Sequence, residues 1–138
     1  MFDSEIIHVR RAIIVSPQSV LERPSVLMVQ RAPQPTTKLD PLMFECPGGQ
    51  VEKEETPLKT LQREVQEECG LQVLGITRGP YDYSRPTVVL GHTPKLLYVV
   101  YHFHVEVAPF RLKDVILSHE HIQAEFVDLL EVINTLGN

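Results

Sequence analysis

Residues 49–71 read GQVEKEETPLKTLQREVQEECGL, and this stretch combines a strong helix signal with a high density of carboxylates. Thr56 followed by Pro57 is typical of a helix start, because the threonine hydroxyl caps the first backbone amides and proline suits the first helical position. Gly70 stands where a left-handed residue would end that helix. The sequence therefore predicts a helix that begins at Pro57 and ends just before Gly70.

Three glutamates of this helix share one flank. Glu64, Glu67 and Glu68 are spaced i, i+3 and i+4, so their side chains gather beside the apolar stripe that should face the core. Like charges about 6 Å apart repel by roughly 3 kcal/mol per pair at an effective dielectric near 20. Mg²⁺ or Mn²⁺, which bind carboxylate oxygens, would remove this repulsion, whereas the other interpretation is a solvated acidic face.

The spacing across the whole stretch separates these interpretations. Gly49, Glu55, the run Arg63-Glu64-Val65, the pair Glu67-Glu68 and the pair Gly70-Leu71 match every fixed position of the Nudix box. This box is the signature of hydrolases that cleave nucleoside diphosphates linked to another group, and the chain therefore resembles the Nudix family. It departs from the family at Glu54, where members often carry glycine. We expect this glutamate either to stiffen the loop or to add charge to it.

The resemblance implies a single Nudix hydrolase domain over residues 1–138, with an α/β/α sandwich and a mixed β-sheet. The hydrophobic pattern alone supports only a mixed α/β domain. Pro47, Gly48 and Gly49 predict a turn before the helix. The remaining pattern predicts strands at residues 6–15, 25–31, 43–46, 71–77, 87–90 and 96–107, and a final helix after Phe126.

The resemblance also implies a set of metal-binding and catalytic residues. Glu64, Glu67 and Glu68 would hold Mg²⁺, for which Mn²⁺ can substitute, and Arg63 would orient them by bidentate pairing. The carbonyl of Gly48 is a further candidate metal ligand, and Glu55 is a candidate for the outer shell of the metal.

A further acidic residue of the site, outside the box, is expected near the end of the chain. Glu120 lies six residues before Phe126 and matches the family's acidic residue that binds a metal or acts as general base. His119, His121 and Glu125 are alternatives, because the alignment of this loop can shift by several residues.

Three residues are expected to contact the substrate or support its site. Arg31 ends the strand at residues 25–31, where similar proteins carry a phosphate-contacting arginine, and Glu45 directly precedes the Pro47 turn. Arg85 lies in a long loop, residues 78–95, whose cations and tyrosines suit nucleotide recognition, with a solvated loop as the alternative. Two HxH pairs, at residues 102–104 and 119–121, leave open a zinc site, a position in the cleft, or ordinary core and surface placement.

Composition limits the classes of function. The chain has 138 residues and a net charge of −5, and an acidic chain without a basic stripe argues against nucleic-acid or anionic-membrane binding. No apolar run is long enough to span a membrane, and the N-terminus lacks a signal-peptide pattern. Two cysteines are too few for a disulfide scaffold, which favours a reduced, cytoplasmic setting. Related enzymes are often homodimers, so a homodimer is a further expectation.

The substrate is less constrained than the chemistry. The approach to the box, FECPGG, resembles that of MutT-like enzymes that sanitise the nucleotide pool, which makes a nucleoside triphosphate or related nucleotide the preferred substrate. Pro86, fifteen residues beyond Leu71, keeps ADP-ribose or a nucleotide sugar as the alternative, because ADP-ribose pyrophosphatases carry a proline near this position. A non-catalytic, nucleotide-sensing Nudix-like domain is the third hypothesis.

Overall fold

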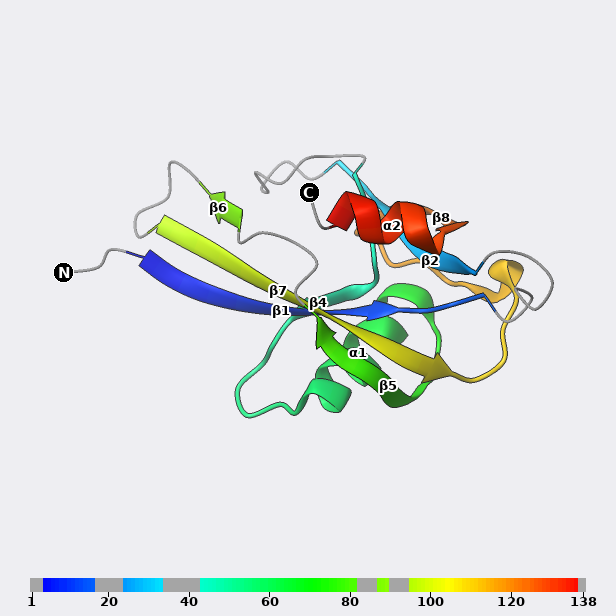
Figure 1. Ribbon diagram of the computed structural model, residues 1–138, viewed down its shortest axis with the longest axis horizontal. Helices are drawn as coiled ribbons and strands as arrows, with labels where there is room; N and C mark the ends of the chain where they lie inside the picture. Colours follow the sequence, from blue (N-terminus) through cyan, green and yellow to red (C-terminus); the bar gives the residue numbers. More distant parts are fainter. Residues whose placement is uncertain (1–3, 17–23, 34–42, 82–86, 90–94, 137–138) are drawn as a thin grey trace.

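Two β-sheets form the centre of the computed structural model, which describes residues 4–16, 24–33, 43–81, 87–89 and 95–136 (Figure 1). The statements below concern these residues. The elements along the chain are β1 (Ser4–Ile13), β2 (Ser25–Arg31), β3 (Phe44–Glu45), β4 (Gly48–Gln50), α1 (Pro57–Cys69), β5 (Val73–Tyr81), β6 (Thr87–Val89), β7 (Lys95–Val107), a 3₁₀ turn (Leu112–Asp114), β8 (His121–Asp128) and α2 (Leu129–Leu136).

The larger sheet is mixed. Its strand order is β4-β1-β7-β5, with β6 also paired to β7. Strands β1 and β7 run parallel, and the other pairs in this sheet are antiparallel. The smaller sheet is antiparallel, with the order β3-β2-β8. The predicted mixed α/β fold with a mixed sheet is therefore confirmed.

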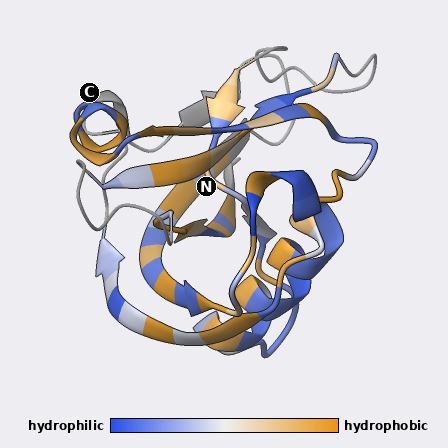
Figure 2. Ribbon diagram, turned by 90° about the vertical axis from the view of Figure 1, so that its right-hand side faces the viewer, coloured by the Kyte–Doolittle hydropathy of each residue, from blue (hydrophilic) through white to orange (hydrophobic). Residues whose placement is uncertain are grey.

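The strands bury side chains on both faces. Leu27 and Val29 of β2 belong to the cluster that includes Leu61 and Val65 of α1. The alternate β2 residues Val26 and Met28 join a second cluster with Val132 of α2. Successive residues of a strand point to opposite faces, so the two helices cover opposite sides of the sheets, as Figure 1 shows. Hydrophobic and hydrophilic residues alternate along other strands, as the colour bands in Figure 2 show.

Most of the predicted elements are present, and two differ. Strand β2 and helix α1 lie where the sequence predicts them. The turn predicted at Pro47, Gly48 and Gly49 is reduced to a bend at Pro47, because the two glycines form β4 and pair with β1. The pairing is so close that a Cβ on Gly48 would lie 2.2 Å from the carbonyl oxygen of Arg10. Strand β8 was not predicted, because its many polar residues give no clear strand pattern and the strand depends on pairing with β2.

In the described part of the chain, no helix is both long and apolar enough to cross a membrane.

Candidate active site

Helix α1 presents its three glutamates very differently to solvent. Thr56 caps the helix by accepting a hydrogen bond from the Lys59 amide, and the chain turns left-handed at Gly70 with φ of 70°. With the ends set in this way and Leu61 buried, Glu68 points inward and is only 3% exposed. By contrast, the side chain of Glu67 is 60% exposed. The glutamates predicted to act together thus occupy a range from core to surface.

Glu68 lies against strand β4. The backbone amide of Gly48 donates a hydrogen bond of 2.9 Å to Glu68 Oε1. Burial raises the pKa of Glu68 to about 7, although this hydrogen bond and the charges of His121 and Arg11 act in the opposite direction. A carboxylate with so little solvent binds a proton near neutral pH unless another cation takes the proton's place.

Glu45 is the centre of a second cluster. Arg31 donates a hydrogen bond of 2.6 Å to Glu45 Oε1, and Arg11 Nη1 lies 3.4 Å from Glu45 Oε2. The ring of His121 approaches the same oxygen at 3.0 Å through Nε2. Burial by itself would raise the pKa of Glu45, but Arg11, the His121 hydrogen bond and Arg31 outweigh it and lower the pKa to about 2. Glu45 is therefore a firmly ionised carboxylate.

The two clusters meet at His121. Glu45, Glu68 and His121 each offer one potential ligand atom, and these atoms lie within 4.8 Å of one another. Within the described ranges, this is the only group of three or more histidine, cysteine or acidic side chains whose potential ligand atoms lie this close together. The residues come from β3, α1 and β8, so the site exists only when the two sheets and the helix are assembled.

Arg63 organises the acidic residues nearer the surface. It forms a bidentate pair with Glu55, at 2.8 and 2.9 Å, and a further ion pair of 2.6 Å with Glu64. A third interaction, of 3.0 Å, reaches the carbonyl of Gln50 on β4. The hydrogen bonds from Arg63 hold the pKa of Glu55 at about 2. The orienting role of Arg63 stays a prediction, with which this pairing is compatible.

Glu64 sits in a space that glycine leaves open. A Cβ on Gly49 would lie 2.4 Å from the carboxyl carbon of Glu64. Burial raises the pKa of Glu64, Arg63 lowers it, and the charges of Glu67 and Glu120 raise it further. Glu120 itself is exposed in the turn before β8, and its charge acts on the same carboxylate as that of Glu67.

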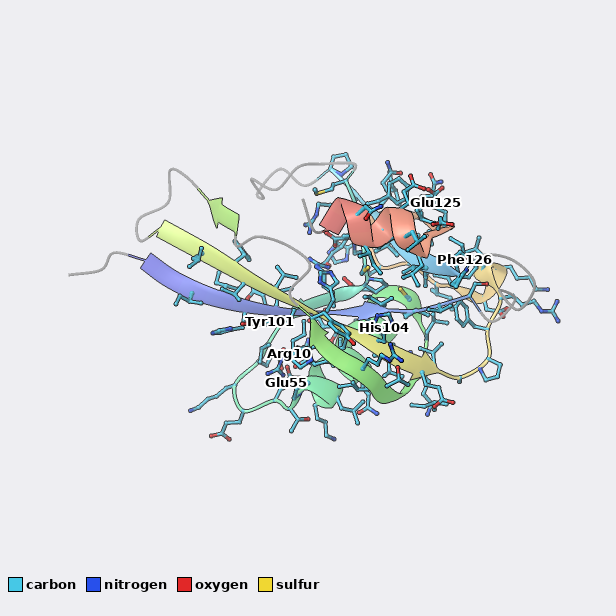
Figure 3. All side chains as sticks on the ribbon, viewed as in Figure 1. Arg10, Glu55, Tyr101, His104, Glu125 and Phe126 are labelled. Atoms are coloured by element: carbon cyan, nitrogen blue, oxygen red, sulfur yellow. The ribbon has the colours of Figure 1, made fainter. Side chains whose placement is uncertain are left out.

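Two arginines of β1 join the site without having been predicted to do so. Arg10 donates to the carbonyl of Glu55 at 3.0 Å and to Thr60 Oγ1 at 2.9 Å, and Figure 3 shows it beside Glu55. Arg11 points to the other face of the strand and donates to the carbonyl of Cys46 at 2.8 Å. The signal in the sequence was that two adjacent cations interrupt an apolar strand. Successive side chains of a strand point to opposite faces, so these two arginines reach different parts of the site.

The remaining predicted residues fall outside this centre. Arg85 and Pro86 lie outside the described residues. The HxH pairs do not converge, because His121 is the only one of their four histidines in the described Glu45–Glu68–His121 group. His104, which Figure 3 labels, instead packs its ring edge-on against Tyr81, at 5.6 Å between centroids. His104 also lines a groove of about 350 Å³ together with the end of β7 and residues 108–110, and this groove contains none of the acidic or arginine residues predicted for the site.

Comparisons with known proteins bear on the family of this chain. A family model described as the NUDIX domain matches residues 8–138. No curated protein gives a significant sequence match.

Solved structures share the fold. A MutT protein from Methanosarcina mazei Go1 is 22% identical, with a TM-score of 0.62 and coverage of 97% of this chain and 85% of that one. The E. coli ORF135 protein is 24% identical, with a TM-score of 0.61 and coverage of 97% and 81%. An Ap4A hydrolase from C. elegans is 19% identical, with a TM-score of 0.56 and coverage of 95% and 85%. With the family match spanning nearly the whole chain, this protein belongs to the Nudix family of hydrolases.

Proposed function

We propose that this Nudix hydrolase uses Mg²⁺ to hydrolyse a phosphoanhydride bond in a nucleoside triphosphate or a related nucleotide. The observation that carries the proposal is that helix α1 holds two of its glutamates in different environments. Glu68 is buried with a raised pKa, and Glu64 is held by Arg63 at 2.6 Å. A buried carboxylate that is costly to ionise, beside a second carboxylate that Arg63 holds in place, suits a divalent cation that binds oxygen.

The donor set supports this choice of cation. Carboxylates of Glu64, Glu67 and Glu68, with the carbonyl of Gly48, supply the oxygen ligands that Mg²⁺ prefers. Glu55 belongs in the outer shell, because Arg63 already occupies both of its oxygens. When bound, Mg²⁺ neutralises the diphosphate and lowers the pKa of an attached water.

The other residues bind, orient or move protons. Arg63 keeps Glu64 and Glu55 in fixed positions, which matters because small displacements of reacting groups are expensive in rate. Arg31 has five N–H donors in its guanidinium, so pairing with Glu45 leaves donors for phosphate oxygens. Glu120 is our candidate general base, since it is exposed to solvent and its charge reaches Glu64.

A panel of substrates tests the proposal. Nucleoside triphosphates (including oxidised ones), ADP-ribose, nucleotide sugars and dinucleoside polyphosphates are incubated with Mg²⁺ or Mn²⁺, and products are separated by chromatography. We expect hydrolysis of a triphosphate, and its loss in Glu68→Gln. Glu131→Gln, which changes an exposed carboxylate on α2, is the matched control. Preferential cleavage of ADP-ribose would replace the substrate assignment, and tight nucleotide binding without any hydrolysis would favour a sensor.

Quaternary structure is a separate proposal. We expect a homodimer without affinity for nucleic acid. Light scattering at several protein concentrations, with and without an oligonucleotide, measures both properties.

A further inference from the structure

His121 is the first residue of strand β8, and the pairing of this strand with β2 holds it in a buried position. It pairs in register with Arg31 of β2, next to a shift in that register. The amide of Ala32 donates to the carbonyl of Glu120 at 2.8 Å, which fixes the backbone just before the histidine. The side chain is 2% exposed, so both ring nitrogens need partners within the protein or from a bound ligand.

The two ring nitrogens face different carboxylates. Nε2 lies 3.0 Å from Glu45 Oε2, which is within hydrogen-bond distance. Glu45 also contacts two guanidinium groups, those of Arg31 and Arg11, and therefore accepts the Nε2 proton as an ionised carboxylate. With Nε2 directed to Glu45, Nδ1 is the ring nitrogen that has no protein partner among the described residues.

Nδ1 is aimed at Glu68 without bonding to it. It is a buried atom with no hydrogen-bond partner, and it lies 3.9 Å from Glu68 Oε2. No hydrogen bond joins the two side chains across this gap. Ligand atoms that each lie about 2.1 Å from one cation are separated by roughly 3.0 to 4.2 Å, depending on the angle between them. The separation observed here falls in that range.

We propose that His121 Nδ1 and Glu68 together bind a divalent cation, with Glu45 as the residue that positions the imidazole. This inference rests on the proposed function, because Glu68 belongs to the same metal centre. A nitrogen ligand distinguishes the centre from a site made only of oxygens. Imidazole suits transition metals, whereas Mg²⁺ is suited by carboxylates, carbonyls and water. The protein should therefore bind Co²⁺ more tightly than Mg²⁺.

Metal binding without substrate tests this inference. Pulsed EPR of the Mn²⁺-loaded protein should detect coupling to an imidazole nitrogen, and calorimetry should give tighter binding for Co²⁺ than for Mg²⁺. In His121→Gln, whose amide can still reach Glu45, we expect the coupling to disappear. Affinity for Co²⁺ should fall at least about tenfold, while affinity for Mg²⁺ should change by less than about threefold. His8→Gln, which alters an exposed ring on β1, is the control.

The outcomes separate this inference from the proposed function. Coupling that persists in His121→Gln, or a wild type without coupling, would overturn the nitrogen ligand even if nucleotides are hydrolysed. Coupling that depends on His121 in a protein that hydrolyses nothing would sustain the metal site and reject the proposed function. If His121→Gln fails to fold, histidine ¹⁵N NMR of the wild type decides the question. Of the six histidines, His121 Nδ1 should shift most on addition of Zn²⁺.

Discussion

Replacing Glu68 with glutamine should make the metal-free protein more stable at alkaline pH while it abolishes hydrolysis. Glu68 is 3% exposed, and burial raises its pKa from 4.5 to about 7. Between these pH values the folded chain keeps a proton that the unfolded chain has released. Stability therefore falls as the pH rises through this window. A pKa difference of about 2.5 units corresponds to about 3 kcal/mol, at 1.36 kcal/mol per unit.

Glutamine removes this cost because it is neutral at every pH. Its amide oxygen can accept the hydrogen bond that Gly48 now donates to Glu68 Oε1. Its amide group would lie near His121 Nδ1, a buried atom that has no hydrogen-bond partner among the described residues. In the presence of EDTA, we therefore expect the variant to exceed the wild type in unfolding free energy by about 3 kcal/mol at pH 8. At pH 5 the excess should be less than about 1 kcal/mol.

Urea unfolding followed by circular dichroism measures the difference, since the chain has no tryptophan for fluorescence. Glu67→Gln is the matched control, because its side chain is 60% exposed and the same change of charge should have little effect. Mg²⁺ should then stabilise the wild type and not Glu68→Gln, by mass action on the folded state. A variant that is less stable than the wild type at pH 8, or an excess that does not depend on pH, would refute the reasoning.

Three further changes test other parts of the site and its loop. Gly49→Ala should reduce kcat about 10- to 100-fold with a small change in Tm, because its Cβ would displace only the end of the Glu64 side chain. Gly75→Ala is the control and should change neither value, because its Cβ meets no atom within 4 Å. Arg63→Lys should lower kcat/KM at least tenfold, since lysine cannot form the bidentate pair, and activity close to that of the wild type would remove Arg63 from the orienting role. Glu54→Gly should raise the unfolding free energy by about 0.5–1 kcal/mol, because Glu54 adopts a φ of 63°, and a loss of stability on urea unfolding would contradict this.

The φ value at Glu54 also shows what the departure from the family pattern at this residue means for the backbone. A left-handed residue is the usual place for glycine, so the glutamate keeps a backbone conformation that suits glycine better. The sequence showed that the residue differs, and only the backbone shows what the difference costs.

Local sequence determined helix α1 and its chemistry. The Thr56 cap, the apolar stripe and the spacing of Arg63 with its glutamates are set within a few turns, where side chains at i, i+3 and i+4 meet whatever the rest of the chain does. The family followed from that spacing, and with it the expectation of a metal centre.

Tertiary structure decided which glutamate is buried and what surrounds it. Glu45, Glu68 and His121 are separated along the chain by 20 residues or more, and they meet because β3 and β8 both pair with β2 while α1 packs across the sheets. Strand β8 could not be recognised from its own residues, since pairing rather than intrinsic preference stabilises it. Burial, charge and the direction of the His121 ring arise from that assembly, which is why the nitrogen beside Glu68 was visible only in the folded protein.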